Sequence, residues 1–318
     1  MIVKKREIPL FLLKLKALLR RLPPQHPKFP VISEDFKKRQ SGYNGECSID
    51  YQLSFLDETK YSIFHDIRLQ DQTHFFQIDT LLMSTKFALI IEVKNIAGTL
   101  YFDPLFEQLI RTKDGEETAF PNPIHQVQRQ ELQLRNWFAA QRLKEVPIFS
   151  LVVISNPQTI IQTAPSPTNL PNKVIHRNLL PTKINQFENK IKAPILTEKE
   201  LKKGIRLLQK HHTEADVSIL ERYQISSDEL INGVFCPSCE SIPLTKIHGA
   251  WLCQTCQTKS KDAHFAALND FKLLIGPNIT NGQMREFLHI PTMKAASRLL
   301  LSMNLPYTGA KKNRIYQL

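Results

Sequence analysis

The stretch FFQIDTLLMSTKFALIIEVKN, residues 75–95, decides the fold of the first half of the chain. Its two apolar runs are typical of neighbouring β-strands, and residues 84–85 between them predict a tight turn, so the runs are expected to form a hairpin. Three charged residues, Asp79, Glu92 and Lys94, nevertheless lie within this apolar segment. Charged side chains are rarely buried in a sheet without a partner or a chemical role. The hairpin therefore predicts a candidate site as well as a core.

The elements around the hairpin predict a mixed α/β domain that ends near residue 190. Apolar spacing indicates a helix over about residues 42–56 and a long amphipathic helix over residues 124–143, which begins after Pro121 and Pro123. The apolar run VPIFSLVVIS is typical of a strand covered on both faces. The predicted order is helix, three or four strands, helix and strand.

The rest of the chain divides into segments of different composition. Residues 1–40 are expected to form a basic amphipathic helix, ended by Pro23-Pro24, and a linker. Residues 157–172 are rich in Pro, Thr and Asn and predict a loop. The predicted domains are therefore 1–40, an α/β domain over 41–190, a helical linker over 191–232, a cysteine-rich module over 233–262, and a tail over 263–318.

Charge and composition restrict the class of partner. The 318 residues include 42 Lys and Arg against 30 Asp and Glu, which gives a net charge of +12 and a pI near 9.4. This surplus favours a polyanionic partner such as nucleic acid. No segment approaches the roughly 20 uninterrupted apolar residues of a membrane helix. The five cysteines suit a reducing compartment with one metal site, so we expect a cytoplasmic protein.

The charged residues of the hairpin have the spacing of a cation site. Glu92 and Lys94 are two apart on a strand and leave the same face, whereas Val93 points to the other. The predicted pairing places Asp79 level with residues 90–92, so two carboxylates can meet at one hard cation, which requires oxygen ligands. A lysine on that face can stabilise charge on a phosphate. The alternative is a cross-strand salt bridge on a solvated face.

Several motifs in order resemble the NERD (nuclease-related) domain. They are Gly45-Glu46, then QIDTLL, then IIEVKN followed by AG, and then NPIHQ, and the resemblance covers about residues 41–155. That domain is assigned to the PD-(D/E)xK nuclease superfamily, which implies a restriction-endonuclease-like α/β fold with a mixed sheet flanked by helices. QID stands here where the superfamily has its namesake Pro-Asp.

The resemblance implies a role for each site residue. Asp79, Glu92 and the carbonyl of Val93 would hold Mg²⁺ (or Mn²⁺), and Lys94 would be the catalytic lysine. Glu46 would add an acid beside the metal, although a carboxylate on a helix surface is the alternative. Gln126 would contact the site or the scissile phosphate, with a helix-capping role as its alternative.

A second metal site is predicted from the residues alone. The sequence FCPSCESIPLTKIHGAWLCQTC holds two CxxC pairs separated by thirteen residues. This spacing is typical of a tetrahedral four-thiolate zinc site, which is structural because it leaves no open position. The predicted ligands of this zinc ribbon are Cys236, Cys239, Cys253 and Cys256.

The tail resembles a helix-turn-helix with a small wing. A short helix capped by Thr280 or Asn281 is followed by a turn at Pro291, a second helix over about 292–304 and a final strand. On this interpretation the second helix enters a groove of DNA and the wing contacts phosphates. A small helical cap on the ribbon is the alternative. The predicted nucleic-acid-binding residues are Lys294, Arg298, Lys311, Lys312 and Arg314.

These parts together predict a Mg²⁺-dependent nuclease that acts on DNA, held to its substrate by the ribbon and the tail. The first alternative is a non-catalytic DNA- or RNA-binding protein that uses the nuclease fold as a scaffold. The second is a protein that binds a membrane surface through its N-terminal helix. Nucleases of this superfamily often act as homodimers, but the sequence defines no dimer interface. It also leaves open the substrate's structure, its sequence and the pathway.

Overall fold

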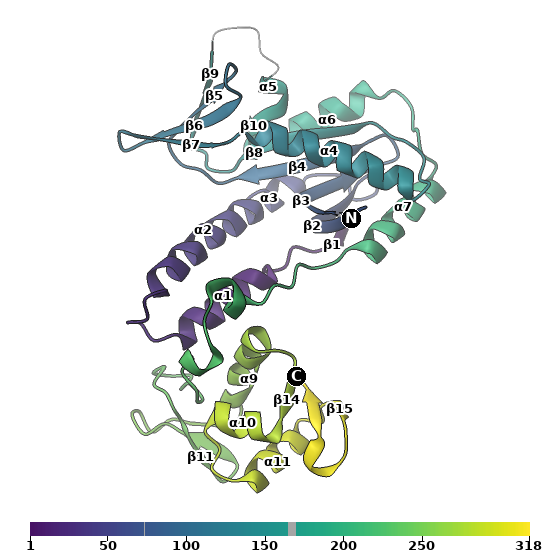
Figure 1. Cartoon of the computed structure of the whole chain (residues 1–318). Helices are drawn as coiled ribbons and strands as arrows, with labels where there is room; N and C mark the ends of the chain where they lie inside the picture. Colours follow the sequence, from purple (N-terminus) through teal and green to yellow (C-terminus); the bar gives the residue numbers. More distant parts are fainter. Residues whose placement is uncertain (73, 165–169) are drawn as a thin grey trace. The chain divides into compact units, whose positions relative to one another are not determined.

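The computed structural model describes residues 1–72, 74–164 and 170–318, except for the side chain of Lys312. It divides into two compact units, each assembled from two stretches of chain (Figure 1). The first unit contains Met1–Ile8 and Lys38–Ala215, and the second contains Pro9–Lys37 and Asp216–Leu318. The predicted N-terminal segment 1–40 is thus shared between the two units.

The first unit is built on a mixed six-stranded sheet with the strand order β1-β2-β3-β4-β8-β10. Strand β3 is antiparallel to both of its neighbours, β2 and β4, and β1, β8 and β10 each pair in parallel with a neighbour. The predicted hairpin is confirmed, with Thr80 opposite Ile91 and Met83 opposite Ala88. The strands are β1 (Ile2–Lys4), β2 (Ser62–Asp71), β3 (His74–Met83), β4 (Ala88–Lys94), β8 (Ile148–Ile154) and β10 (Val174–His176).

Helices cover both faces of this sheet and make a three-layer core. On one face, α4 (Pro123–Ala140) and α7 (Glu198–His211) pack through Val127, Leu134 and Leu208. On the other face, α3 (Asp50–Leu53) and α6 (Leu180–Lys190) pack through residues such as Leu53 and Ile184. Strand β4 lies between the two layers, and six of its seven residues are buried. Its uninterrupted apolar sequence follows from this double coverage.

A second sheet of four strands, in the order β7-β6-β5-β9, follows β4 and was only partly predicted. Strand β5 (Thr99–Asp103) is the fourth of the three or four strands that the sequence indicated. Strand β6 (Gln108–Lys113) is mostly half-buried around Leu109, β7 (Glu116–Pro121) is mostly exposed, and neither has a regular apolar alternation. Strand β9 (Ile160–Thr163) lies within the predicted loop 157–172, of which residues 165–169 are outside the described part. Two short elements complete the unit, α5 (Leu170–Lys173) and the 3-10 helix η1 (Arg177–Leu179).

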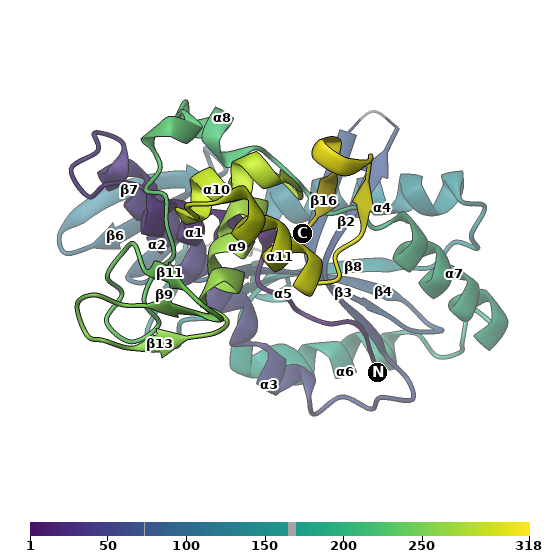
Figure 2. The same cartoon turned by 90° about the horizontal axis from the view of Figure 1, so that it is seen from below.

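The second unit combines helices with two small sheets (Figures 1 and 2). Its helical core joins α1 (Leu10–Arg21) to α8 (Ile219–Tyr223) and α9 (Ala263–Leu274). The buried guanidinium of Arg21 contacts the buried Asp270 carboxylate at 2.8 Å. The other elements are η2 (Ser227–Glu229), β11 (Thr245–Ile247), β12 (Ala250–Leu252), β13 (Lys259–Ser260), β14 (Asn278–Thr280), α10 (Asn281–Leu288), α11 (Met293–Ser302), β15 (Tyr307–Thr308), η3 (Lys311–Asn313) and β16 (Ile315–Gln317).

Helix boundaries differ from the prediction in two places. The N-terminal helix begins at Leu10, after Pro9, because residues 2–4 instead form the strand β1 and pair with β2. The helix predicted over 42–56 is the end of a longer helix, α2 (Phe29–Cys47), followed by the separate α3. Helix α7 begins with a capping box, in which Thr197 and Glu200 exchange side-chain and backbone hydrogen bonds.

A buried histidine makes the stability of the second unit depend on pH. Burial, and secondly the nearby Lys246, lower the pKa of His264 to about 4. Between pH 6.5 and 4 the unfolded chain binds a proton at this position and the folded chain does not, so stability falls as pH decreases through this window. The expected loss is on the order of 3 kcal/mol.

His264→Gln is the matched variant, because its amide oxygen can still accept the hydrogen bond that Trp251 Nε1 donates. Urea unfolding at pH 7 and pH 4.5 measures the effect in both proteins. The wild type should lose more stability than the variant, and an equal loss in both would contradict the assignment to His264.

Candidate active site

The charged residues of β4 lie on the face of the sheet that α4 covers. Ala88 and Ile90 pack in the cluster under α4, whereas Leu89, Ile91 and Val93 pack in the cluster on the opposite face. Continuation of this alternation places Glu92 and Lys94 beside the first turns of α4. The predicted division of Glu92 and Lys94 from Val93 is therefore confirmed.

Strands β2 and β3 both change face at the level of the site. On β3, Ile78 and Leu81 pack in the same cluster although they are three residues apart, and on β2, Phe64 and Ile67 do the same. The change is centred on Asp66, whose backbone has a φ of +51°. A left-handed residue within a strand is uncommon, and such irregularities often lie beside functional sites. Here the irregularity ends the regular pairing of β3 with β4 at Thr80 and frees Asp79 from the ladder.

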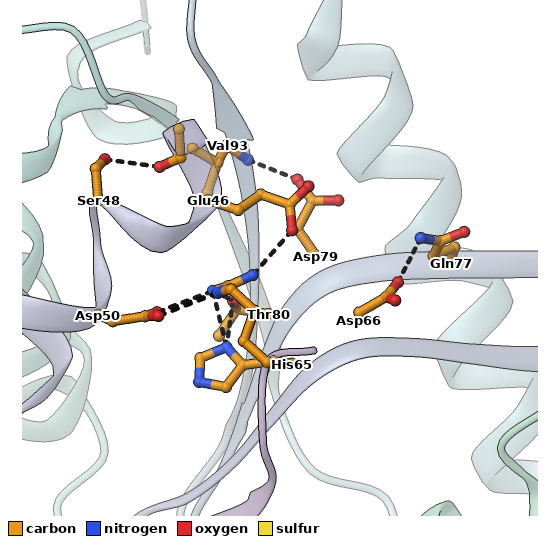
Figure 3. Close-up of polar contacts among 11 residues, drawn as sticks. Glu46, Ser48, Asp50, His65, Asp66, Gln77, Asp79, Thr80 and Val93 are labelled. Carbon is orange, nitrogen blue, oxygen red and sulfur yellow. Dashed lines mark hydrogen bonds and ion pairs between the residues drawn. The ribbon is translucent and has the colours of Figure 1, made fainter. Parts of the chain in front are cut away.

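Asp79 lies where β3 and β4 separate. Its Oδ2 accepts a hydrogen bond of 2.9 Å from the backbone N–H of Val93, and its carboxylate points toward Glu46 (Figure 3). Burial, followed by the charges of Glu92 and Glu46, raises the pKa of Asp79 well above its usual value. The side chain keeps a partial opening to solvent. A positive ion at this point would therefore relieve a large electrostatic cost.

Lys94 and Glu92 form the polar centre on the α4 side. Lys94 Nζ donates to Glu92 Oε1 at 2.7 Å and to Gln126 Oε1 at 3.0 Å. The other oxygen of Glu92, which is 3 % exposed, accepts a hydrogen bond of 3.0 Å from Gln130 Nε2. Gln126 is thus brought to the site as predicted, whereas Gln130 was missed. Its signal was its position one helical turn after Gln126 on the same face.

Glu46 enters from the last turn of α2 and is held by an arginine that the sequence did not indicate. Arg6 Nη1 donates to Glu46 Oε2 at 2.9 Å, and Arg6 Nη2 donates to Asp50 Oδ1 at 3.0 Å. Burial is the main cause that raises the pKa of Glu46 to about 7, and the charges of Asp66 and Glu92 act in the same direction against Arg6. Burial and Arg6 lower the pKa of the neighbouring His65 to about 4.

A glycine allows α2 to approach the end of β4 closely. A Cβ added at Gly45 would lie 2.5 Å from Asn95 Cβ and 3.0 Å from Ser155 Oγ. Asn95 also holds the helix, because its Nδ2 donates to the Ser41 carbonyl at 2.8 Å. The absence of a side chain at Gly45 therefore fixes where Glu46 stands.

Gly45→Ala is expected to destabilise the first unit by about 1–3 kcal/mol, since this closely packed position has no room for a methyl group. Gly42→Ala is the matched control, because nothing lies within 4 Å of the added Cβ and alanine is the better helix former. Urea unfolding of both variants should show opposite signs. A neutral Gly45→Ala would show that α2 moves freely at this contact.

The donors of the site fit a hard cation only in part. Asp79 and Glu92 supply carboxylate oxygens, the ligands that Mg²⁺ prefers. In the described ranges, the four cysteines alone form a group of three or more His, Cys, Asp or Glu residues whose ligand atoms lie within 4.8 Å of one another. In this side-chain arrangement a cation would therefore be held by fewer than three of the acids Glu46, Asp79 and Glu92. The Val93 carbonyl and water would complete its shell.

The four predicted zinc ligands converge in the second unit. The Sγ atoms of Cys236 and Cys256 are 3.6 Å apart, as are those of Cys239 and Cys253. Sulfurs around a tetrahedral zinc stand ~3.8 Å apart for Zn–S bonds of about 2.3 Å. A hydrogen bond from the Ser241 hydroxyl, followed by one from the Cys256 N–H, lowers the pKa of the Cys253 thiol to about 5. The group therefore has the chemistry and spacing of a four-thiolate zinc site.

The predicted tail elements are present, and their basic residues differ in exposure. Lys294 and Arg298, four positions apart on α11, are exposed, as is Lys311. Arg314 is half-buried, with its guanidinium 4.4 Å from the centre of the Tyr307 ring. Lys312 falls outside the described side chains. Trp251 is fully buried and packs in the core of the second unit, so it cannot stack on a base.

Comparison with known proteins agrees with the geometry of the first unit. The model of the nuclease-related domain (NERD) matches residues 41–155, which is less than half of the chain. Neither the curated proteins nor the solved structures that were compared include a match. No helix in the described ranges has the length and apolar character needed to cross a membrane. The matched region contains Glu46, Asp79, Glu92, Lys94 and Gln126.

Proposed function

We propose that the first unit is a Mg²⁺-dependent nuclease that hydrolyses phosphodiester bonds in DNA, and that the second unit binds the nucleic acid. The observation that carries the proposal is the contact of Lys94 with Glu92 and Gln126 near Asp79. The Asp79 side chain is half-buried, and its pKa is raised by burial and by the neighbouring acids. The match of this region to the nuclease-related domain supports it. The domain limits and the roles of the site residues in this proposal are those that the sequence predicts.

Each residue of the site has a separate task in this proposal. Asp79, Glu92 and the Val93 carbonyl would hold Mg²⁺ (or Mn²⁺), which when bound supplies Lewis-acid activation of phosphate and water. Lys94 donates hydrogen bonds toward the negative charge that develops on the phosphate. Gln126 and Gln130 keep Lys94 and Glu92 in place through their side-chain amides. Glu46 adds a carboxylate from helix α2, beside that of Asp79 (Figure 3).

The proposed grip on nucleic acid comes from the second unit. The exposed Lys294 and Arg298 share one face of α11, and Lys311, Lys312 and Arg314 lie in the following wing. Positive side chains on such elements contact phosphates, and this agrees with the net charge of +12. The four-cysteine site would hold one structural Zn²⁺ that keeps the zinc ribbon folded.

A cleavage panel tests the proposal. Labelled linear, circular, single-stranded and branched DNA and a matched RNA are incubated with the zinc-loaded chain in Mg²⁺, Mn²⁺ or EDTA. Metal-dependent cutting of a DNA supports the nuclease, and the panel then identifies the substrate's structure. Binding without cutting under every metal, with a steep loss of affinity in salt, would instead establish the scaffold alternative.

A further inference from the structure

We propose that Arg6 is a positioning residue of the first unit's carboxylate site, which holds Glu46 in place and limits the affinity of the site for a divalent cation. The inference rests on the proposed nuclease function and extends it to a residue outside the matched region 41–155. The site would then be incomplete without the N-terminal strand.

Strand β1 brings Arg6 to the site. It runs parallel to β2, with Ile2 opposite Ile63 and Lys4 opposite Phe64, so the register shifts by one residue along this short pairing. The chain leaves the sheet after Lys4, and the side chain of Arg6 turns inward, where it is 5 % exposed. A long cationic side chain is buried to this extent only when it is paired.

The guanidinium joins four elements at one point. Besides its contacts with Glu46 on α2 and Asp50 on α3, Arg6 Nη2 donates to Thr80 Oγ1 on β3 at 3.2 Å. It also lies 2.8 Å from His65 Nδ1 on β2. Arginine has no acceptor, so His65 Nδ1 must accept, which leaves the arginine as the permanent cation of the pair. The planar fork with five donors explains why this position suits arginine better than lysine.

Two consequences follow for the acids of the site. The contact with Arg6 restricts the Glu46 carboxylate to one position beside Asp79 (Figure 3). The positive charge of Arg6 also repels any cation that Asp79 and Glu92 attract. Arg6 acts from the side of Glu46, whereas the Lys94 ammonium contacts Glu92. Fixed positions of the groups at a reacting centre favour turnover.

Removal of Arg6 should therefore change cleavage and metal binding in opposite directions. Arg6→Gln leaves Glu46 without its anchor and is expected to slow cleavage at least about tenfold, since small misplacements of site groups are costly. It also removes a positive charge, so Mn²⁺ affinity should rise on the order of fivefold. Arg6→Lys keeps the charge but loses the fork, so cleavage should fall with little change in Mn²⁺ affinity.

The experiment uses the full zinc-loaded chain. Mn²⁺ affinity is measured by calorimetry without DNA, and cleavage is measured on the DNA of the panel that the wild type cuts. Lys5→Gln is the matched control, because it removes an exposed positive charge from the adjacent position and should change neither quantity. Glu46→Gln combined with Arg6→Gln should cut no more slowly than Glu46→Gln alone, because the anchor matters only through the carboxylate.

The outcomes separate this proposal from the nuclease proposal. A parallel fall of cleavage and Mn²⁺ affinity in Arg6→Gln would show that Arg6 only fastens β1, and unchanged cleavage would exclude a positioning role. A wild-type chain that binds Mn²⁺ but cuts nothing would overturn the nuclease proposal. The affinity comparison between wild type and Arg6→Gln would still decide whether Arg6 limits cation binding.

Discussion

Lys94→Ala is expected to reduce metal-dependent cleavage by about 10²- to 10³-fold while DNA binding persists. Lys94 Nζ lies 2.7 Å from Glu92 Oε1, and its loss removes a preorganised donor from the place where phosphate charge is expected to develop. Its loss also leaves Gln126 without its partner at 3.0 Å. The measurement is single-turnover cleavage at saturating enzyme, which separates the chemical step from binding.

Lys86→Ala provides the matched comparison for Lys94→Ala. Lys86 also forms an ion pair with a glutamate, at 2.8 Å from Glu188, but it lies in the turn at the other end of β4. Its removal therefore tests whether any lost ion pair slows cleavage. Equal effects of the two substitutions would show that Lys94 has a structural role only, and the nuclease mechanism would have to be abandoned.

Removal of zinc is expected to unfold the cysteine module of the second unit. Structural zinc sites contribute apparent binding energies of roughly 10–16 kcal/mol near neutral pH, which exceeds the stability of most domains. Trp251 is fully buried beside Val234 and Leu244, so unfolding of the module by a chelator should expose this side chain. The chain has two tryptophans, and Trp137→Phe leaves Trp251 as the only reporter.

Metal analysis and fluorescence check this expectation. The purified chain should carry one zinc, and chelation should shift the emission of Trp251 to longer wavelength. Cys253→Ser should prevent zinc retention, whereas Cys47→Ser, at the cysteine outside the cluster, should not change it. A zinc-free chain with buried Trp251 and a disulfide between paired cysteines would favour a redox pair.

The parts of the site that the sequence predicted are those that depend on local periodicity. Glu92 and Lys94 follow from alternation along one strand, and the four cysteines follow from the short spacing of each pair. Asp79 was placed on the correct strand, but the change of face near Asp66 has no periodic signal because it depends on one residue's backbone conformation.

The parts that the sequence did not predict depend on distant contacts. Arg6 and Thr80 are separated by 74 positions, and the basic stretch around Arg6 has the composition of an exposed arm rather than of a buried strand. Strands β6 and β7 were missed because Leu109 is the only fully buried residue of the two strands, so selection for apolar residues at alternate positions is weak.

The division of the second unit into two stretches has a consequence during protein synthesis. Leu15 and Leu18 of α1, with Leu22 directly after it, share a core cluster with Ile219 and Leu274 from the far part of the chain. About 200 residues are translated between these partners, which at roughly 5–20 residues per second takes on the order of 10–40 s. During that time the partners of α1 from its own unit are limited to the start of α2, with Phe29, Ile32 and Phe36. The nascent chain therefore presents apolar surface of α1 to chaperones on the ribosome, although the folded protein buries that surface.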